Sequence, residues 1–152
     1  MQSCHTCTLT ARRDAGTAPL WDTIYRTDHW DVVHSCNTSL RGWLVLVARR
    51  HIAAIAELTA AEAAELGDLQ RRVSQALHAV TGCAKTYIIQ FAEHPDHPHV
   101  HFHIVPRMAD QPAERRSVNI FSCLGVPETE RVSEEGMNAV GVQIRQFLQN
   151  TH

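Results

Sequence analysis

The segment His99–Val105, with the sequence HVHFHIV, alternates histidine with bulky apolar residues. Side chains of a β-strand point alternately to opposite faces, so this period of two predicts a strand with one face in the core. The three histidines would share the other face, with successive imidazoles about 6.6–7 Å apart. They are His99, His101 and His103. Three imidazoles in register opposite an apolar face indicate a functional site rather than an exposed polar face.

These histidines have a limited set of roles. An imidazole can act as a nucleophile, carry a proton or bind a metal ion near neutral pH. In a strand, His99 and His103 would lie roughly 13–14 Å apart, too far to share one ion with bonds of about 2 Å. The three side chains must therefore have different roles.

The rest of the pattern predicts an α+β fold with a mostly antiparallel sheet of about five strands and two helices. The expected strands are Trp21–Arg26, His29–Ser35, Gly42–Arg49, Thr86–Ala92 and His99–Val105. The first helix begins at a capping box of Thr59 and Glu62 and ends at Gly82. The second is amphipathic and carries Met137, Val140, Ile144 and Phe147/Leu148. Residues 107–131 show no clear period, which favours a loop.

The length and net charge of the chain exclude several classes of protein. The chain has 152 residues, which suits one domain, 1–152. A formal net charge of −2 gives no electrostatic basis for binding nucleic acid or an anionic membrane. The chain has no apolar run long enough for a membrane span and no signal peptide. We therefore expect a soluble, cytoplasmic protein.

Five cysteines, an odd number, without an export signal argue against a disulfide framework. Cys4 and Cys7 have the C-x-x-C spacing of a zinc half-site, and the alternative is a frayed, reduced N-terminus. His51 and one histidine of the triplet are the natural candidates for two further ligands. The remaining cysteines are expected to be buried thiols: Cys36, Cys83 and Cys123.

The triplet followed by Pro106-Arg107 resembles the signature of the histidine triad (HIT) superfamily of nucleotide hydrolases and transferases. The resemblance covers residues 4–107, with a Cys-x-x-Cys, a Gly-containing strand ending in Arg-Arg-His and a helix beginning in Leu-Thr. It implies a HIT core over 4–107, followed by a loop and C-terminal helix over 108–152. The Pro-Arg ending is more similar to diadenosine polyphosphate hydrolases than to phosphoramidases.

The resemblance also implies roles for individual residues. His101 would attack the α-phosphorus of a nucleotide and form a covalent nucleotidyl-histidine, while His103 would hydrogen-bond the phosphate oxygens. As in the related galactose-1-phosphate uridylyltransferases, the first histidine would bind a structural zinc ion. The implied ligands are Cys4, Cys7, His51 and His99. Relatives also imply a homodimer.

The chain departs from the family pattern at several positions. Trp43 follows Gly42 where many relatives have histidine, and Ala48 stands where a proline is usual. Pro95 and Asp96 occupy the place of the Ser or Gln that contacts the leaving group.

Three other residues are candidates for binding the substrate. His94 or His97 could supply the missing donor, although each is also a plausible turn residue. Asn37 lies where relatives bind the ribose, and it is equally a plain turn former.

Three functions therefore stay open. The first is hydrolysis or transfer of a nucleotide through His101, with a dinucleoside polyphosphate or a nucleotide phosphoramidate as substrate. The second is a zinc-stabilised nucleotide-binding or scaffold protein with weak or no catalysis. The third is a hydrolase in which the histidines hold a catalytic zinc ion.

Overall fold

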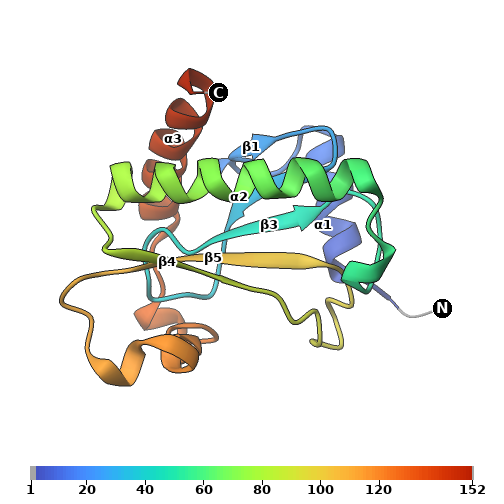
Figure 1. Ribbon diagram of the computed structural model, residues 1–152. Helices are drawn as coiled ribbons and strands as arrows, with labels where there is room; N and C mark the ends of the chain where they lie inside the picture. The colour runs from blue at the N-terminus through green and yellow to red at the C-terminus, as the bar shows by residue number, and fades with distance from the viewer. Residues whose placement is uncertain (1–2, 152) are drawn as a thin grey trace.

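A five-stranded antiparallel sheet forms the centre of the computed structural model, which describes residues 3–151. Its strands lie in the order β1-β2-β3-β5-β4 (Figure 1). Their bounds are Tyr25–Arg26 for β1, Trp30–His34 for β2, Leu44–Ala48 for β3, Lys85–Ile89 for β4 and His101–Arg107 for β5. The predicted α+β fold with an antiparallel sheet is confirmed.

Three α-helices surround this sheet: α1 His5–Asp14, α2 Ala60–Thr81 and α3 Glu134–Asn150. The predicted capping box opens α2, since Thr59 accepts from the Glu62 amide and the Glu62 carboxylate accepts from the Thr59 amide. Gly82 closes α2 with a left-handed φ of 69°, a conformation that glycine adopts at little cost. None of the helices among residues 3–151 is both long and apolar enough to cross a membrane.

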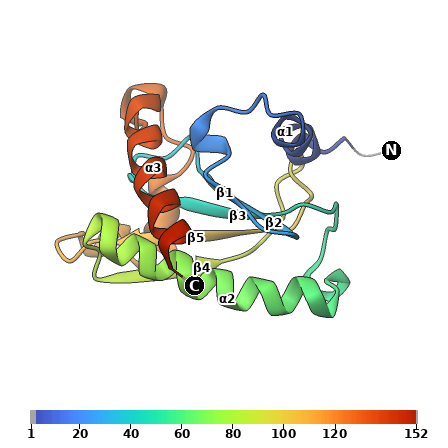
Figure 2. The ribbon, with the colours of Figure 1, turned by 90° about the horizontal axis from the view of Figure 1, so that it is seen from above.

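The two faces of the sheet have different covers. Helix α2 lies along one face with α3 beside it, whereas α1 lies on the other side (Figure 2). The first face holds the larger core, in which Phe102 and Ile104 of β5 pack against leucines of α2. A smaller cluster covers part of the second face, where Ile120 and Cys123 pack on Val45 of β3. The imidazoles of β5 lie on this second face because they alternate with Phe102 and Ile104.

Several predicted boundaries were wrong. β1 is only Tyr25–Arg26, because Leu20–Asp22 forms a 3-10 turn. β5 begins at His101 rather than His99, which lies in the preceding bend. Helix α1 was not predicted, since its apolar periodicity is weak and its buried side chains are Thr6, Thr10 and Arg13.

The predicted loop over 107–131 is also more ordered than expected. It contains three 3-10 helices, over Ala113–Arg115, Ser117–Cys123 and Glu128–Glu130. Such short helices leave no long period in a sequence. The middle one supplies Ile120 and Cys123 to the smaller core.

Candidate active site and metal centre

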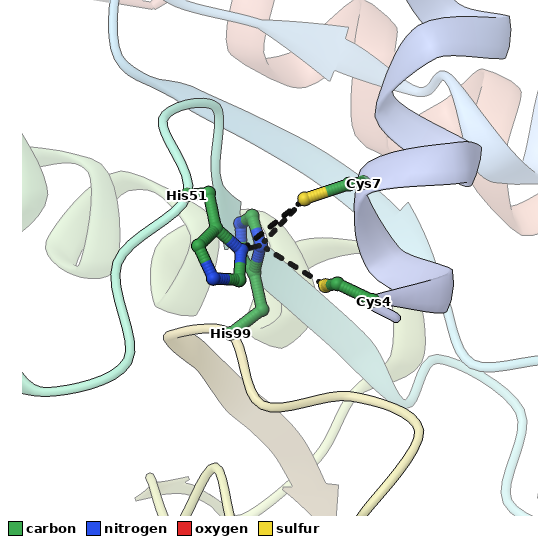
Figure 3. Close-up of side chains that lie close together, drawn as sticks. All are labelled: Cys4, Cys7, His51 and His99. Carbon is green, nitrogen blue, oxygen red and sulfur yellow. Dashed lines mark hydrogen bonds between the residues drawn. The ribbon is translucent and has the colours of Figure 1, made fainter. Parts of the chain in front are cut away.

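Two cysteines and two histidines from three distant segments meet at one end of the sheet (Figure 3). They are Cys4 and Cys7 at the start of α1, His51 after β3, and His99 before β5. Their nearest ligand atoms all lie within 4.8 Å of one another. The structure thus brings together all four residues that the family resemblance implied as metal ligands.

The spacing of these atoms fits one tetrahedral ion. Four atoms bound to zinc at about 2.0–2.3 Å stand roughly 3.3–3.8 Å apart. His99 Nδ1 lies 3.6 Å from Cys4 Sγ, 3.6 Å from Cys7 Sγ and 3.2 Å from His51 Nδ1. His99 Nε2 lies 2.6 Å from the carbonyl oxygen of Ala48. Donation to that carbonyl places the proton on Nε2 and leaves the Nδ1 lone pair free for a metal.

The electrostatics of the four donors favour a cation. Burial, followed by a hydrogen bond with the adjacent Cys4 and the charge of that thiol, raises the pKa of Cys7 to about 11. Two thiolates side by side therefore repel each other when no cation is bound. A bound cation would offset this repulsion and stabilise both thiolates. Burial also lowers the pKa of His99, which favours the neutral ring that binds metals.

Helix α1 is held against the sheet by buried charges as well as by the cysteines. The Arg13 guanidinium donates to Asp22 at 2.9 Å and lies 3.5 Å from Asp31 on β2. Asp31 also accepts from Arg26 at 2.7 Å, and Arg26 pairs with Asp14 at the end of α1. This network fixes the helix that carries the two cysteines, and it could not be predicted from the sequence because single charges leave no pattern.

His101 is the first residue of β5 and lies beside Val47 of β3. Its Nδ1 is 2.7 Å from the carbonyl oxygen of His99. A carbonyl only accepts, so Nδ1 carries the proton and Nε2 keeps its lone pair. Within residues 3–151, His101 Nε2 has no hydrogen-bond partner, and the side chain is partly exposed. This is the arrangement that a nucleophilic imidazole needs.

His103 lies two residues further along β5, beside Val45 of β3. Its ring centroid is 5.2 Å from that of His101, at an interplanar angle of 79°. Burial, followed by the charge of His101, lowers the pKa of His103 to about 4. The ring is therefore neutral near pH 7. Phe121 packs edge-on against it, with ring centroids 5.7 Å apart.

The structure gives Asn37 a turn-forming role. It lies between β2 and β3, where its side-chain oxygen accepts from the Ser35 hydroxyl at 3.0 Å. Its backbone carbonyl accepts from the amide of Gly125 at 2.9 Å. The first bond lies within the turn, and the second joins the turn to the segment before α3. Ribose binding by Asn37 stays a prediction.

The loop 94–98 lies against the start of α1. The Asp96 carbonyl accepts from the His5 amide at 2.8 Å, and the Thr6 hydroxyl lies 2.7 Å from His97 Nδ1. His94 is exposed, and its Nδ1 accepts from the Asp96 amide at 3.1 Å. His94 therefore stabilises the turn, and a contact with substrate stays a prediction.

The cysteines outside the cluster are not all buried. Cys83 and Cys123 are buried, as expected, but Cys36 is exposed, so that prediction was wrong. Cys36 follows the last residues of β2 in an irregular turn, where the alternation of a strand no longer predicts burial.

Comparison with known proteins agrees with this geometry. A model of the HIT domain matches residues 21–110, more than half of the chain. The chain belongs to the HIT family. The family consists of nucleotide-binding proteins that are generally hydrolases or transferases, although some members are not catalytic. No curated protein matches the chain.

Solved structures of HIT proteins share the fold. A histidine triad protein from Bradyrhizobium japonicum is 25% identical, with a TM-score of 0.67, and the match covers 82% of this chain and 87% of that one. A zinc-bound histidine triad protein from Mycobacterium smegmatis is 17% identical, with a TM-score of 0.66 and 98% of both chains covered. A HIT-like protein from Bartonella henselae is 16% identical, with a TM-score of 0.67, and the match covers 90% of this chain and 93% of that one.

Proposed function

We propose that the protein cleaves or transfers the α-phosphate of a nucleotide through a covalent intermediate on His101. The observation that carries this proposal is the hydrogen bond of His101 Nδ1 to the His99 carbonyl, which leaves Nε2 with a lone pair on an accessible ring. The neutral His103 beside it is the second supporting feature. The proposed substrates are dinucleoside polyphosphates or nucleotide phosphoramidates.

In the first step, His101 Nε2 attacks the α-phosphorus and forms a P–N bond. The bond from phosphorus to the leaving group breaks, and its electron pair departs with the leaving group. A neutral nucleophile avoids the repulsion that an anion would meet at a charged phosphate. The positive charge that develops on the ring is stabilised by the hydrogen bond from Nδ1 to the His99 carbonyl. His103 donates to a phosphoryl oxygen as charge develops there.

In the second step, water or another acceptor attacks phosphorus from the side opposite the P–N bond. The P–N bond breaks, its electron pair returns to Nε2, and the acceptor loses its proton to solvent. His101 is then restored. Water as acceptor gives hydrolysis, and any other hydroxyl gives transfer.

We further propose that Cys4, Cys7, His51 and His99 bind zinc, as a zinc-bound family member of the same fold supports. When bound, zinc would supply the positive charge that stabilises the two thiolates. All four tetrahedral positions would be filled by protein, which is typical of a structural site. His99 would link the two sites, because its side chain belongs to the metal cluster and its carbonyl accepts from His101.

An adduct-trapping experiment tests the covalent mechanism. The protein is mixed with diadenosine triphosphate labelled at the α-phosphorus and quenched in alkaline denaturant, because nucleotidyl-histidine is labile in acid. We expect label on the wild-type protein and none on His101→Ala. His78→Ala is the matched control, since His78 is an exposed histidine of α2.

A chemical-rescue experiment tests the same role of His101. In His101→Gly, added imidazole should restore cleavage by taking the place of the missing ring.

The scaffold function has one observation in its favour. In the loop 94–98, Pro95 and Asp96 offer no hydroxyl or amide side chain that could contact a leaving group. If this loss removes catalysis, the wild-type protein will bind a mononucleotide in calorimetry but form no adduct. That result would contradict the covalent proposal and support the scaffold.

A further inference from the structure

Trp43 lies between the β2–β3 turn and the start of β3, and its side chain is fully buried. Its indole Nε1 is 2.9 Å from His103 Nδ1, and the two rings meet edge to face with centroids 5.6 Å apart. An indole N–H can donate a hydrogen bond but cannot accept one. His103 Nδ1 must therefore be the acceptor and carry no proton.

This contact determines where the His103 proton lies. A neutral imidazole carries one proton, so a bare Nδ1 places that proton on Nε2. The alternative tautomer would set two N–H groups against each other inside the protein and leave both unsatisfied. Among residues 3–151, His103 Nε2 has no protein partner and is not one of the fully enclosed polar atoms. It is thus free to donate to a ligand beside His101.

The surroundings hold the indole in place. The Gly42 amide donates to His34 Nε2 at 3.0 Å, and His34 Nδ1 lies 2.7 Å from the Ser35 carbonyl. The Trp43 carbonyl accepts from the Ser35 amide at 2.9 Å. Phe121 packs against the indole ring at 5.7 Å. Backbone and ring are therefore both fixed, as a positioning role requires.

We propose that Trp43 is a positioning residue that holds His103 as the Nε2–H tautomer, so that His103 always offers a donor to the phosphoryl group. A histidine at position 43 could donate or accept, depending on its own tautomer, and could become charged. Indole can only donate and does not become charged near neutral pH, so the orientation of the His103 donor does not depend on the protonation of residue 43. The catalytic consequence rests on the proposed function, whereas the tautomer itself does not.

Nitrogen NMR of the free protein labelled with ¹⁵N-histidine tests the tautomer without substrate. We expect the His103 Nδ1 signal in the range of unprotonated nitrogen and the Nε2 signal in that of protonated nitrogen. A scalar coupling across the hydrogen bond should link Trp43 Nε1 to His103 Nδ1. A protonated Nδ1 in the wild-type protein would overturn the proposal, and this measurement needs no variant that might misfold.

Two variants test the consequence. Trp43→Phe keeps an aromatic ring and removes the N–H, so His103 should shift toward the Nδ1–H form or a mixture. We expect kcat to fall by about 10- to 100-fold with a smaller change in KM, since a donor to the developing charge is lost.

The second variant, Trp43→His, restores a ring N–H. It should recover part of the kcat and part of the Nε2–H form of His103. An unchanged tautomer or an unchanged kcat in Trp43→Phe would overturn the positioning role. Absence of activity in the wild type would instead count against the proposed function.

Discussion

At the scale of single residues, three histidines outside the metal cluster differ in the partners of their ring nitrogens. His101 donates through Nδ1 to a carbonyl, His103 accepts at Nδ1 from an indole, and His34 uses both nitrogens within the protein. The same side chain is therefore proposed as a nucleophile, a donor or a structural link, according to which nitrogen its neighbour occupies. Composition and spacing do not reveal this difference, because it depends on the local backbone around each ring and on contacts across neighbouring strands.

His34 provides a pH-dependent prediction. Burial, against the opposing effect of the Ser35 carbonyl and with a smaller contribution from the positive charge of Arg41, lowers its pKa to about 4. Between pH 6.5 and about 4 the unfolded chain binds a proton at this site that the folded chain does not. The free energy of unfolding must therefore fall as the pH falls through this range, with roughly 2 kcal/mol lost from this residue between pH 7 and pH 5.

Urea unfolding of His34→Gln at pH 7 and pH 5 measures this contribution. Glutamine keeps an acceptor and a donor but does not titrate, so the variant should lose less stability than the wild type between the two pH values. His103, whose pKa is also lowered to about 4, contributes equally in both proteins and cancels. Equal losses in wild type and variant would show that His34 does not carry the effect.

At the scale of elements, two glycines of α2, one at the end of the helix and one inside it, allow a matched pair of substitutions. Gly82 has a φ of 69° and no atom within 4 Å of an added Cβ, so Gly82→Ala costs only the left-handed strain, about 1 kcal/mol. Gly67, inside α2, also has open space around an added Cβ. Gly67→Ala should stabilise by about 0.5–1 kcal/mol through helix propensity.

Thermal unfolding of the two variants should give Tm shifts of opposite sign, about 2–4 °C downward for Gly82→Ala and about 1–4 °C upward for Gly67→Ala. Both changes add one methyl group in open space, so a difference in burial cannot explain the sign. Shifts in the same direction would contradict the assignment of Gly82 as the end of the helix.

The elements that could be predicted from sequence are those whose signal is local. α2 has a capping box, an apolar stripe and a terminal glycine, and β5 has a period of two. α1 has none of these, because Arg13 and two cysteines rather than an apolar stripe attach it to the protein. The bond from Trp43 to His103 could not be predicted either, since it depends on the register of β3 beside β5.

At the scale of the whole molecule, the cluster of Cys4, Cys7, His51 and His99 attaches α1 to two neighbouring strands that the sheet already pairs. It connects the start of α1, the end of β3 and the residue before β5. The homodimer implied by the family resemblance stays a prediction at this scale, and sedimentation velocity would test it.

Metal replacement separates a structural ion from a catalytic one. We expect one zinc per chain, and its removal by a chelator should lower both Tm and activity, because α1 and the His99 carbonyl lose their anchor. Cys36→Ser is the control for thiol chemistry, since that cysteine is exposed and lies outside the cluster. Cys7→Ser should bind zinc weakly and show the same losses as the chelated protein.

Cobalt and cadmium then distinguish the two roles. With four protein donors around the ion, no position remains for water or substrate, so zinc, cobalt and cadmium forms should have similar kcat once Tm is restored. An ion that activated water or polarised the phosphate would instead give a kcat that changes with the metal, since the acidity of bound water depends on the ion. A large difference in kcat between equally stable metal forms would therefore favour the catalytic zinc, and with it a different role for His101.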